Sequence, residues 1–343
     1  MPVCRALGER VAQTVSLRGP DKLCPTVVEL SFEAWVRSTK MKRPMSFTVP
    51  SFAKINWTLE VLGRRADGYH ELRTLLQTVS LADSLSFSPA DDGIELICDA
   101  PGVPLDDTNL IVRAARWLKE ATGFTGGARI KLDKRIPIGA GLGGGSSNAA
   151  VTLLALQYLW GVKLSPGELF QLGARLGADV PGFFLGGTCI GIGRGDEVYP
   201  LADISFGELL LVKPDFGVST GEVYGSLPDE LTKPFSLDMM PFSLEAAYRS
   251  TFAPGKTLPL LRNDLERSVF VRYPQLSEIK DRLTRTGACA AMMSGSGSTI
   301  FALFDSKAML SVARQEFSDT GWWSAPVRTI GRAEYRAALG VFA

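Results

Sequence analysis

A chain of 343 residues, 45% of them hydrophobic and 21% charged, is long enough for two domains and can bury a full core. Its 37 Lys and Arg residues nearly balance 36 Asp and Glu residues, which argues against nucleic-acid and membrane-surface partners. Five scattered cysteines without C-x-x-C spacing argue against a disulfide framework and a zinc site, and no apolar run is long enough to span a membrane.

The first 44 residues differ from the rest of the chain, because eight Lys or Arg residues stand against four acidic ones. We expect a disordered or loosely attached extension over residues 1–44, with Met41 and Met45 as alternative translation starts. No secretory signal pattern is found, so we expect a cytoplasmic protein with free thiols. A plastid location follows only if this extension is a transit peptide, and transit peptides are usually poorer in acidic residues.

The next part of the chain is rich in β-forming residues. Alternating side chains over Phe47–Leu62 predict two short strands around a Pro-Ser turn. Gly68 and Asp83 are expected at turns between the strands that follow. Those strands are expected over Leu72–Leu81, Ser84–Phe87, Ile94–Ile97 and Ala128–Leu132. Apolar residues at helical spacing predict one helix, over Asn109–Glu120.

The most distinctive segment is a glycine run that leads directly into an apolar helix, expected over Ser147–Trp160. Five glycines fall within seven residues, and glycine lets backbone N–H groups approach a ligand closely. The first helical turn adds unpaired N–H donors and the positive end of the helix dipole, so the segment predicts a phosphate site. The expected phosphate-binding residues are Pro137, Ile138, Gly139, Ala140, Gly141, Leu142, Gly143, Gly144, Gly145, Ser146 and Ser147.

Other glycine-rich motifs fit this run less well. A P-loop requires a lysine after its glycines, and none follows here. The run matches the dinucleotide string Gly-x-Gly-x-x-Gly, but no acidic residue ends a strand about twenty residues later. A flexible linker would not continue without a break into an apolar helix. The sequence therefore favours a phosphate loop of another type over a dehydrogenase or a linker.

The rest of the chain alternates helices and strands. The expected elements are a helix over Ser165–Leu176, a strand over Glu208–Val212, a Pro- and Met-rich linker to about Pro259, and helices over Asn263–Val271 and Tyr273–Thr286. A second Ser/Gly loop lies within Ala290–Phe304 and runs into an apolar strand. This order predicts an α+β protein in two parts, with a cleft between them near residue 205.

Three single residues bear on chemistry, although each also has an ordinary structural interpretation. Lys54 shares a strand face with Asn56, but a strand lysine is usually a solvated edge charge. Asp179 interrupts an apolar stretch, which is costly for a carboxylate without a partner, yet it could serve as a turn residue or N-cap. His70 is the only histidine, and a single histidine is more often incidental than functional.

Taken together, these segments resemble the GHMP kinase superfamily, which includes galactokinase, homoserine kinase and mevalonate kinase. Its three motifs occur in order, as Pro50–Leu59, the glycine run and Ser294–Ser298. Three further segments are similar to the subgroup that phosphorylates a cytidine diphosphate-linked methylerythritol, and they are Gly63–His70, Asp107–Ala115 and Gly177–Pro181. The resemblance covers roughly residues 47–305.

This resemblance implies a two-domain α+β GHMP kinase fold. We expect an N-terminal domain over residues 45–205 that is similar to domain 2 of ribosomal protein S5 and carries the ATP loop. A ferredoxin-like C-terminal domain is expected over residues 206–343. The resemblance implies a supporting part for the Ser294–Ser298 loop in holding phosphate or substrate, and the protein is expected to be a monomer or weak homodimer.

The resemblance also implies roles for single residues. Asp179 would accept the proton of the substrate 2-hydroxyl or orient it, and Lys54 would stabilise the developing charge and keep Asp179 ionised. ATP would be the donor, with Asn109 near its adenosine and Mg²⁺ between its phosphates and the Ser147 hydroxyl. The cytidine base would be bound by Asn56, Tyr69, His70 and Tyr224.

Two alternatives within the same fold stay open. One is a kinase for another small alcohol, of the mevalonate or homoserine type. The other is a ligand sensor without turnover, which the presence of both Lys54 and Asp179 disfavours.

Overall fold

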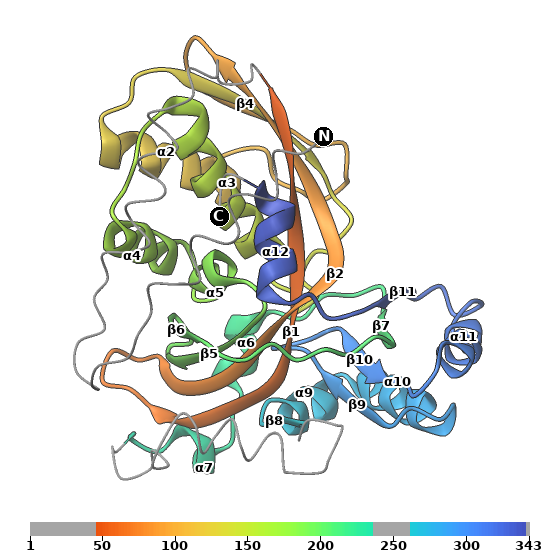
Figure 1. Ribbon diagram of the computed structural model, residues 1–343. Helices are drawn as coiled ribbons and strands as arrows, with labels where there is room; N and C mark the ends of the chain where they lie inside the picture. Colours follow the sequence, from red (N-terminus) through yellow and green to blue (C-terminus); the bar gives the residue numbers. More distant parts are fainter. Residues whose placement is uncertain (1–45, 236–260, 341–343) are drawn as a thin grey trace, which may run out of the picture. The chain divides into compact units, whose positions relative to one another are not determined.

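Two long antiparallel strands, β1 (Phe47–Arg64) and β2 (His70–Ala90), form the centre of the larger sheet in this computed structural model (Figure 1). The structure describes residues 46–235 and 261–340, which belong to one compact unit. The expected extension over residues 1–44 lies outside the described residues. So does the part of the expected linker over residues 236–260.

The prediction of several short strands in this part of the chain is wrong, because β1 and β2 are each continuous. Pro50 pairs with Ser84, and buried positions alternate through the expected Pro-Ser turn, so β1 continues across it. Register shifts between Phe52 and Ala53 and further along absorb the irregularity. Asp83 lies within β2 opposite Ser51 rather than at a turn. Local turn propensity was overruled here by the burial of one sheet face.

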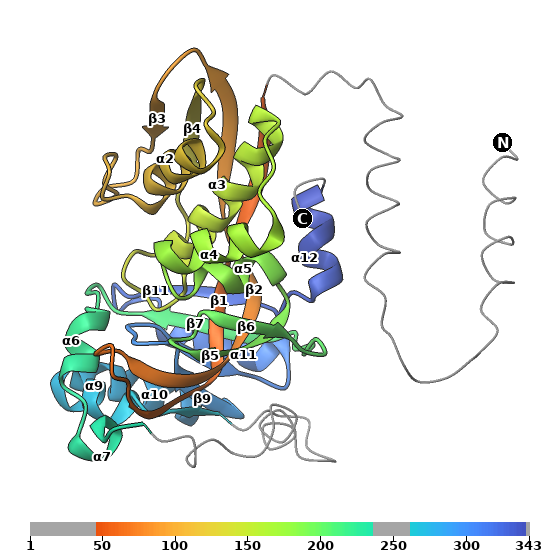
Figure 2. The same cartoon turned by 90° about the vertical axis from the view of Figure 1, so that its left-hand side faces the viewer.

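The larger sheet has seven strands and is ordered β3-β4-β2-β1-β8, with β5 on β2 and β6 on β5. Its shorter strands are β3 (Ile94–Ile97), β4 (Gly127–Asp133), β5 (Thr188–Gly193), β6 (Glu197–Pro200) and β8 (Arg262–Asn263). The helices that share its core are α2 (Leu110–Thr122), α3 (Gly144–Trp160), α4 (Pro166–Leu176) and α5 (Val180–Leu185) (Figure 2). The expected helix over Ser147–Trp160 thus begins three residues earlier, inside the glycine run.

The smaller sheet is ordered β11-β7-β10-β9 and is antiparallel. Its strands are β7 (Leu209–Lys213), β9 (Ala290–Met293), β10 (Ile300–Leu303) and β11 (Trp323–Val327). The accompanying helices are α9 (Glu266–Arg272), α10 (Pro274–Arg285) and α11 (Lys307–Glu316). The helix expected from Asn263 begins only at Glu266, because Asn263 pairs with Leu59 of β1. Residues expected to be linker form α6 (Thr220–Gly225) and α7 (Asp229–Thr232).

The two sheets are joined through shared cores. Side chains of β1, among them Ile55 and Trp57, pack with Leu211 and Phe301 of the smaller sheet. The last helix, α12 (Arg332–Leu339), returns to the core of the larger sheet, where Tyr335 is fully buried. The expected α+β fold class is confirmed, and the domain boundary near residue 205 stays a prediction.

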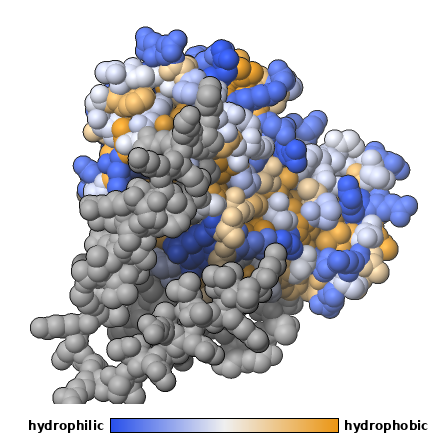
Figure 3. Space-filling view, turned by 45° about the horizontal axis from the view of Figure 1, so that its top comes forward, coloured by the Kyte–Doolittle hydropathy of each residue, from blue (hydrophilic) through white to orange (hydrophobic). Residues whose placement is uncertain are grey.

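The outer surface of the described part is mixed in polarity. Hydrophilic and hydrophobic residues are interspersed over the coloured part of the face drawn in Figure 3. Within residues 46–235 and 261–340, no helix is both long and apolar enough to cross a bilayer.

Candidate functional site

The glycine run forms a loop whose carbonyl groups are tied to two other segments. Leu142 accepts a backbone hydrogen bond from Lys54 of β1 (3.0 Å), and Gly141 accepts one from the Ser294 hydroxyl (3.0 Å). Gly141 has a φ of +72°, and a Cβ atom there would lie 2.1 Å from the carbonyl oxygen of Ser294. The loop therefore needs glycine at this position, and α3 starts directly after it with unpaired N–H groups in its first turn.

A buried carboxylate holds the segment that leads into this loop. Asp83 Oδ1 accepts from the backbone N–H groups of Arg135 (2.7 Å) and Ile136 (2.8 Å). Its Oδ2 accepts from Lys134 Nζ (2.6 Å) and Asn148 Nδ2 (2.9 Å). Burial lowers the pKa of Lys134, and the charge of Asp83 opposes that shift. Sequence reasoning missed this function of Asp83 because it treated the residue as part of a turn.

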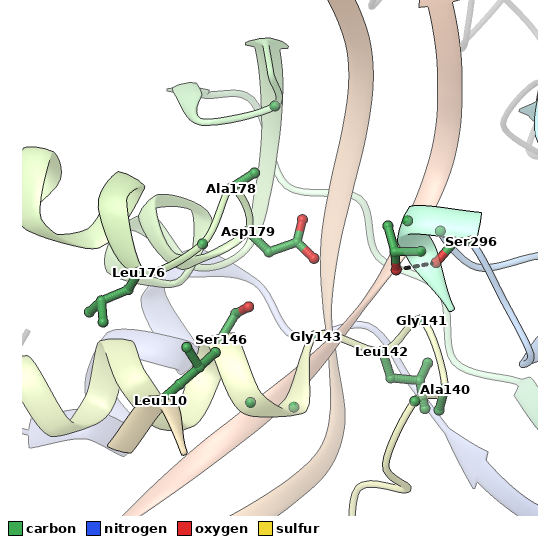
Figure 4. A pocket seen from close by; sticks show the side chains of 18 of the residues that line it. Leu110, Ala140, Gly141, Leu142, Gly143, Ser146, Leu176, Ala178, Asp179 and Ser296 are labelled. Carbon is green, nitrogen blue, oxygen red and sulfur yellow. Dashed lines mark hydrogen bonds between the residues drawn. The ribbon is translucent and has the colours of Figure 1, made fainter. Parts of the chain in front are cut away.

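Lys54 and Asp179 form an ion pair across the loop. Lys54 Nζ lies 3.3 Å from Asp179 Oδ2 and donates to Asn56 Oδ1 at 2.8 Å. The lysine side chain is 7% exposed, so it is not a solvated edge charge. Asp179 precedes α5, but its carboxylate makes no capping bond and is 35% exposed. Figure 4 shows that carboxylate projecting into the pocket, with Ser146 of α3 on the facing wall.

Aromatic side chains form the other end of the site. The rings of His70 and Tyr224 stack at 5.3 Å with 28° between their planes. Burial and the positive charge of Arg64 lower the pKa of His70, so its imidazole is neutral near pH 7. Its Nε2 atom is buried without a hydrogen-bond partner in the described part of the chain. Burial, with a smaller contribution from the charge of Asp179, raises the pKa of Tyr224.

One cavity of about 1100 Å³ connects the glycine loop, the ion pair and the aromatic end. It is lined by every sequence-predicted site residue except Ser147, that is, by Lys54, Asn56, Tyr69, His70, Asn109, Pro137, Ile138, Gly139, Ala140, Gly141, Leu142, Gly143, Gly144, Gly145, Ser146, Asp179 and Tyr224. Sequence reasoning did not identify several further lining residues, including Arg64, Thr74, Lys134, Arg175, Arg194 and Thr220. Apart from Arg64, which lies within the segment Gly63–His70, none of them belongs to a motif quoted above, because separate strands and helices bring them to the cavity.

Two of the predicted residues have side chains engaged elsewhere. Ser147 is fully buried, and its hydroxyl accepts from Ser51 Oγ at 2.7 Å. Because α3 begins at Gly144, Ser147 faces the core while Ser146 lines the cavity. Asn109 caps α2 by accepting from the N–H of Ile111, and it donates to the carbonyl of Pro104.

The comparisons with known proteins agree with this architecture. The model for the GHMP kinases N terminal domain matches residues 109–187, and the model for the GHMP kinases C terminal domain matches residues 253–321. The fold, with its glycine loop beside a lysine–aspartate pair, is that of a small-molecule kinase that uses ATP. The chain belongs to the GHMP kinase family.

Several relatives of this chain carry the name of one particular kinase of this family. The chain is 43% identical over 290 residues to a 4-diphosphocytidyl-2-C-methyl-D-erythritol kinase from Solibacter usitatus, which covers 84% of this chain and 90% of the relative. A kinase of the same name from Thermodesulfovibrio yellowstonii is 40% identical over 283 residues, covering 82% of this chain and 98% of the relative. A crystal structure of 4-(cytidine 5'-diphospho)-2C-methyl-D-erythritol kinase has a TM-score of 0.69 at 38% identity, covering 83% of this chain and 100% of that one.

A more distant structure shows the fold alone. Homoserine kinase from Cytophaga hutchinsonii superimposes with a TM-score of 0.62 at 19% identity, covering 87% of this chain and 98% of that one.

Proposed function

We propose that this protein transfers the γ-phosphoryl group of ATP to the 2-hydroxyl of 4-diphosphocytidyl-2-C-methyl-D-erythritol, in the methylerythritol phosphate route to isopentenyl diphosphate. The observation that carries the proposal is the continuous cavity from the glycine loop past Asp179 to His70. A substrate with a hydroxyl at one end and a nucleoside base at the other matches this cavity, because the hydroxyl can lie beside Asp179 and the base beside His70. Relatives that carry this enzyme's name, at about 40% identity, support the same assignment.

The reaction itself asks mainly for positioning and charge neutralisation. Phosphoryl transfer through a loose transition state needs little proton abstraction at the start. In our proposal, the Asp179 carboxylate orients the 2-hydroxyl and receives its proton as the new P–O bond forms. Lys54 offsets the negative charge on the transferred group and is itself fixed by the 2.8 Å bond to Asn56.

The cavity also has ligands suited to Mg²⁺, which supplies charge neutralisation between phosphate oxygens when bound. Ser146 and Asp179 bring a hydroxyl and a carboxylate to the same cavity, and hard oxygen donors are what this ion prefers. Within the described ranges no three His, Cys, Asp or Glu residues form a metal cluster, so phosphates and water would complete the coordination. We therefore propose Ser146, rather than the buried Ser147, as the hydroxyl ligand.

The aromatic end fits a cytosine base. A neutral imidazole offers one donor and one acceptor, and His70 lines the cavity with its buried Nε2 unpartnered in the described part of the chain. Tyr69 is 59% exposed and can stack on a base, while the ring of Tyr224 packs behind His70. We propose that these groups select the cytidine part of the substrate, with Asn109 and the walls near Leu110 next to the adenosine of ATP.

The deciding experiment compares acceptor alcohols. Purified protein with ATP and Mg²⁺ is assayed for ADP release with 4-diphosphocytidyl-2-C-methyl-D-erythritol, mevalonate and homoserine, and ³¹P NMR identifies the phosphorylated product. We expect turnover with the cytidine-linked substrate only. Comparable turnover with mevalonate or homoserine would refute the proposed substrate, and binding of the cytidine compound without turnover would instead indicate a sensor.

A further inference from the structure

An arginine covers one face of the exposed tyrosine at the aromatic end. The guanidinium carbon of Arg194 lies 5.1 Å from the centre of the Tyr69 ring. Tyr69 belongs to the turn between β1 and β2, and Arg194 belongs to the turn between β5 and β6. Both residues line the cavity. No other ring in the described part of the chain is recorded as stacking on Tyr69, so the guanidinium of Arg194 is the one aromatic or cation–π contact observed for this ring.

Both partners are fixed by their own turns. Arg194 donates to Asp196 Oδ2 from Nε (3.2 Å) and Nη2 (2.6 Å), which sets the plane of its guanidinium. The backbone N–H of Tyr69 donates to Asp67 Oδ1 (3.1 Å), and its carbonyl accepts from the N–H of Arg65 (2.8 Å). Tyr69 as a residue is 59% exposed, so its backbone is held while its ring lies largely in solvent with Arg194 over one face.

We infer that Arg194 is a positioning residue for base recognition, because its guanidinium supports one face of Tyr69 and leaves the other face for the cytosine. This inference rests on the proposed function. A cation over an aromatic face is attractive, and a ring already held in its bound orientation loses less rotational freedom when a base stacks on it. Arg194 thus acts on the nucleoside end through Tyr69, and not on the phosphoryl group that is transferred.

The alternative role for Arg194 is direct contact with the diphosphate of the substrate. Binding of two ligands, cytidine and CDP, distinguishes this role from support of Tyr69. Cytidine carries the base without phosphates, whereas CDP carries both. If Arg194 supports Tyr69, Arg194→Ala weakens the binding of cytidine and CDP by the same factor, about two- to five-fold. A loss confined to CDP would assign Arg194 to the diphosphate and overturn the inference.

A double-mutant cycle tests whether the effect passes through the ring. Calorimetric titration measures cytidine binding to the wild type, Arg194→Ala, Tyr69→Ala and the double variant. We expect Tyr69→Ala to weaken binding by about five-fold or more, as for other base-stacking rings. In the Tyr69→Ala background, Arg194→Ala should add nothing further. Full additivity of the two losses would contradict a role through Tyr69.

Control variants separate positioning from a general loss of structure. Arg282 also lies over an aromatic ring, 4.8 Å from the centre of Phe317, and pairs with Glu316, but it does not line the cavity. Arg282→Ala should leave cytidine binding unchanged. Arg194→Lys keeps the charge without the guanidinium plane and should fall between wild type and Arg194→Ala.

Steady-state kinetics gives an independent readout. Arg194→Ala should raise the KM for the cytidine-linked substrate while kcat and the KM for ATP stay near wild type. Wild-type protein that binds neither cytidine nor CDP would refute the proposed function and this inference with it. Wild-type binding by Arg194→Ala would refute the inference alone.

Discussion

The two ends of the cavity are held in place by different means. At the phosphate end, backbone hydrogen bonds fix the glycine loop, and the fully buried carboxylate of Asp83 accepts four hydrogen bonds beneath it. At the aromatic end, side chains of separate elements meet in pairs, as His70 with Tyr224 and Tyr69 with Arg194. A rigid backbone thus holds the end that we propose binds ATP, and side chains of separate elements form the end that we propose selects the substrate.

This contrast has an energetic consequence. A buried charged network is costly to break, because removing one partner leaves the other without its hydrogen bonds in a low-dielectric surrounding. An exposed ring contact such as that of Arg194 with Tyr69 contributes much less. Variation at Tyr69 and Arg194 should therefore change ligand preference with little loss of stability, whereas variation beneath the glycine loop should reduce stability and ATP binding together.

The largest effect is expected between the two ends, at the ion pair. Asp179→Asn keeps the shape of the side chain but removes the proton acceptor, and it should lower kcat by about 10²–10⁴-fold. Lys54→Met removes the charge that offsets the transferred group and should act in the same direction. The KM for ATP should change little in Lys54→Met, whereas Asp179→Asn should also raise it, because it weakens a proposed ligand of Mg²⁺. Single-turnover measurements check the chemical step. Near-normal turnover by Asp179→Asn would contradict the proposal that Asp179 accepts the proton of the substrate hydroxyl.

Asp83→Ala tests the network beneath the loop. It leaves Lys134 buried without its carboxylate partner, so the free energy of unfolding should fall by about 3–5 kcal/mol, and the KM for ATP should rise. Urea denaturation and steady-state kinetics measure the two effects. As a matched control, Asp107 also pairs with an arginine, Arg116, but both side chains are more than half exposed. Asp107→Ala should therefore cost less than about 1 kcal/mol.

Gly141→Ala tests the geometry of the loop backbone. The left-handed φ of +72° alone costs roughly 1–2 kcal/mol for alanine. The added methyl group would also push against the carbonyl of Ser294, so ATP should bind more weakly. Gly207→Ala is the control, since a Cβ there meets nothing within 4 Å and φ is not positive. Equal ATP affinity in the two variants would contradict the fixed loop described above.

The smallest effect is expected from the titration of His70. Its pKa is lowered by burial and by the charge of Arg64, so the imidazole is neutral above its ordinary pKa of about 6.5 and gains a proton only as the pH falls through the lowered value. Protonation removes the acceptor atom and disfavours the folded state. Stability should be constant above about pH 6.5 and decline below it, as the unfolded chain takes up the proton first, and cytidine binding should decline at the lower pH at which the folded imidazole is protonated.

A variant isolates this titration from others. His70→Gln has no ionisation in this range, so its cytidine affinity should be lower at neutral pH but flatter at acid pH than that of the wild type. Calorimetric titration over a pH series measures both curves. Parallel curves for the two proteins would show that another group controls the acid limb.

Much of the phosphate end could be predicted from the sequence alone. A glycine run before an apolar helix has few other physical uses, because the conformations and N–H groups that it provides are encoded within one short segment. The α+β class followed from alternation and helical spacing in the same local way. The roles proposed for Lys54, Asp179, Tyr69 and His70 came from resemblance to a family, since each residue by itself has an ordinary structural interpretation.

Only the tertiary structure decided which side chains meet. Asp83 was predicted at a turn, but in the structure it lies within β2. Because α3 starts at Gly144, Ser146 lines the cavity and the predicted Ser147 does not. Arg194 lies more than a hundred residues from Tyr69 in sequence, and only the pairing of β5 with β2 brings their turns together. The sequence by itself predicted the glycine loop as a phosphate site, because a local backbone pattern encodes its conformation. The packing of distant elements determined the rest of the site, because such contacts leave no local pattern to read.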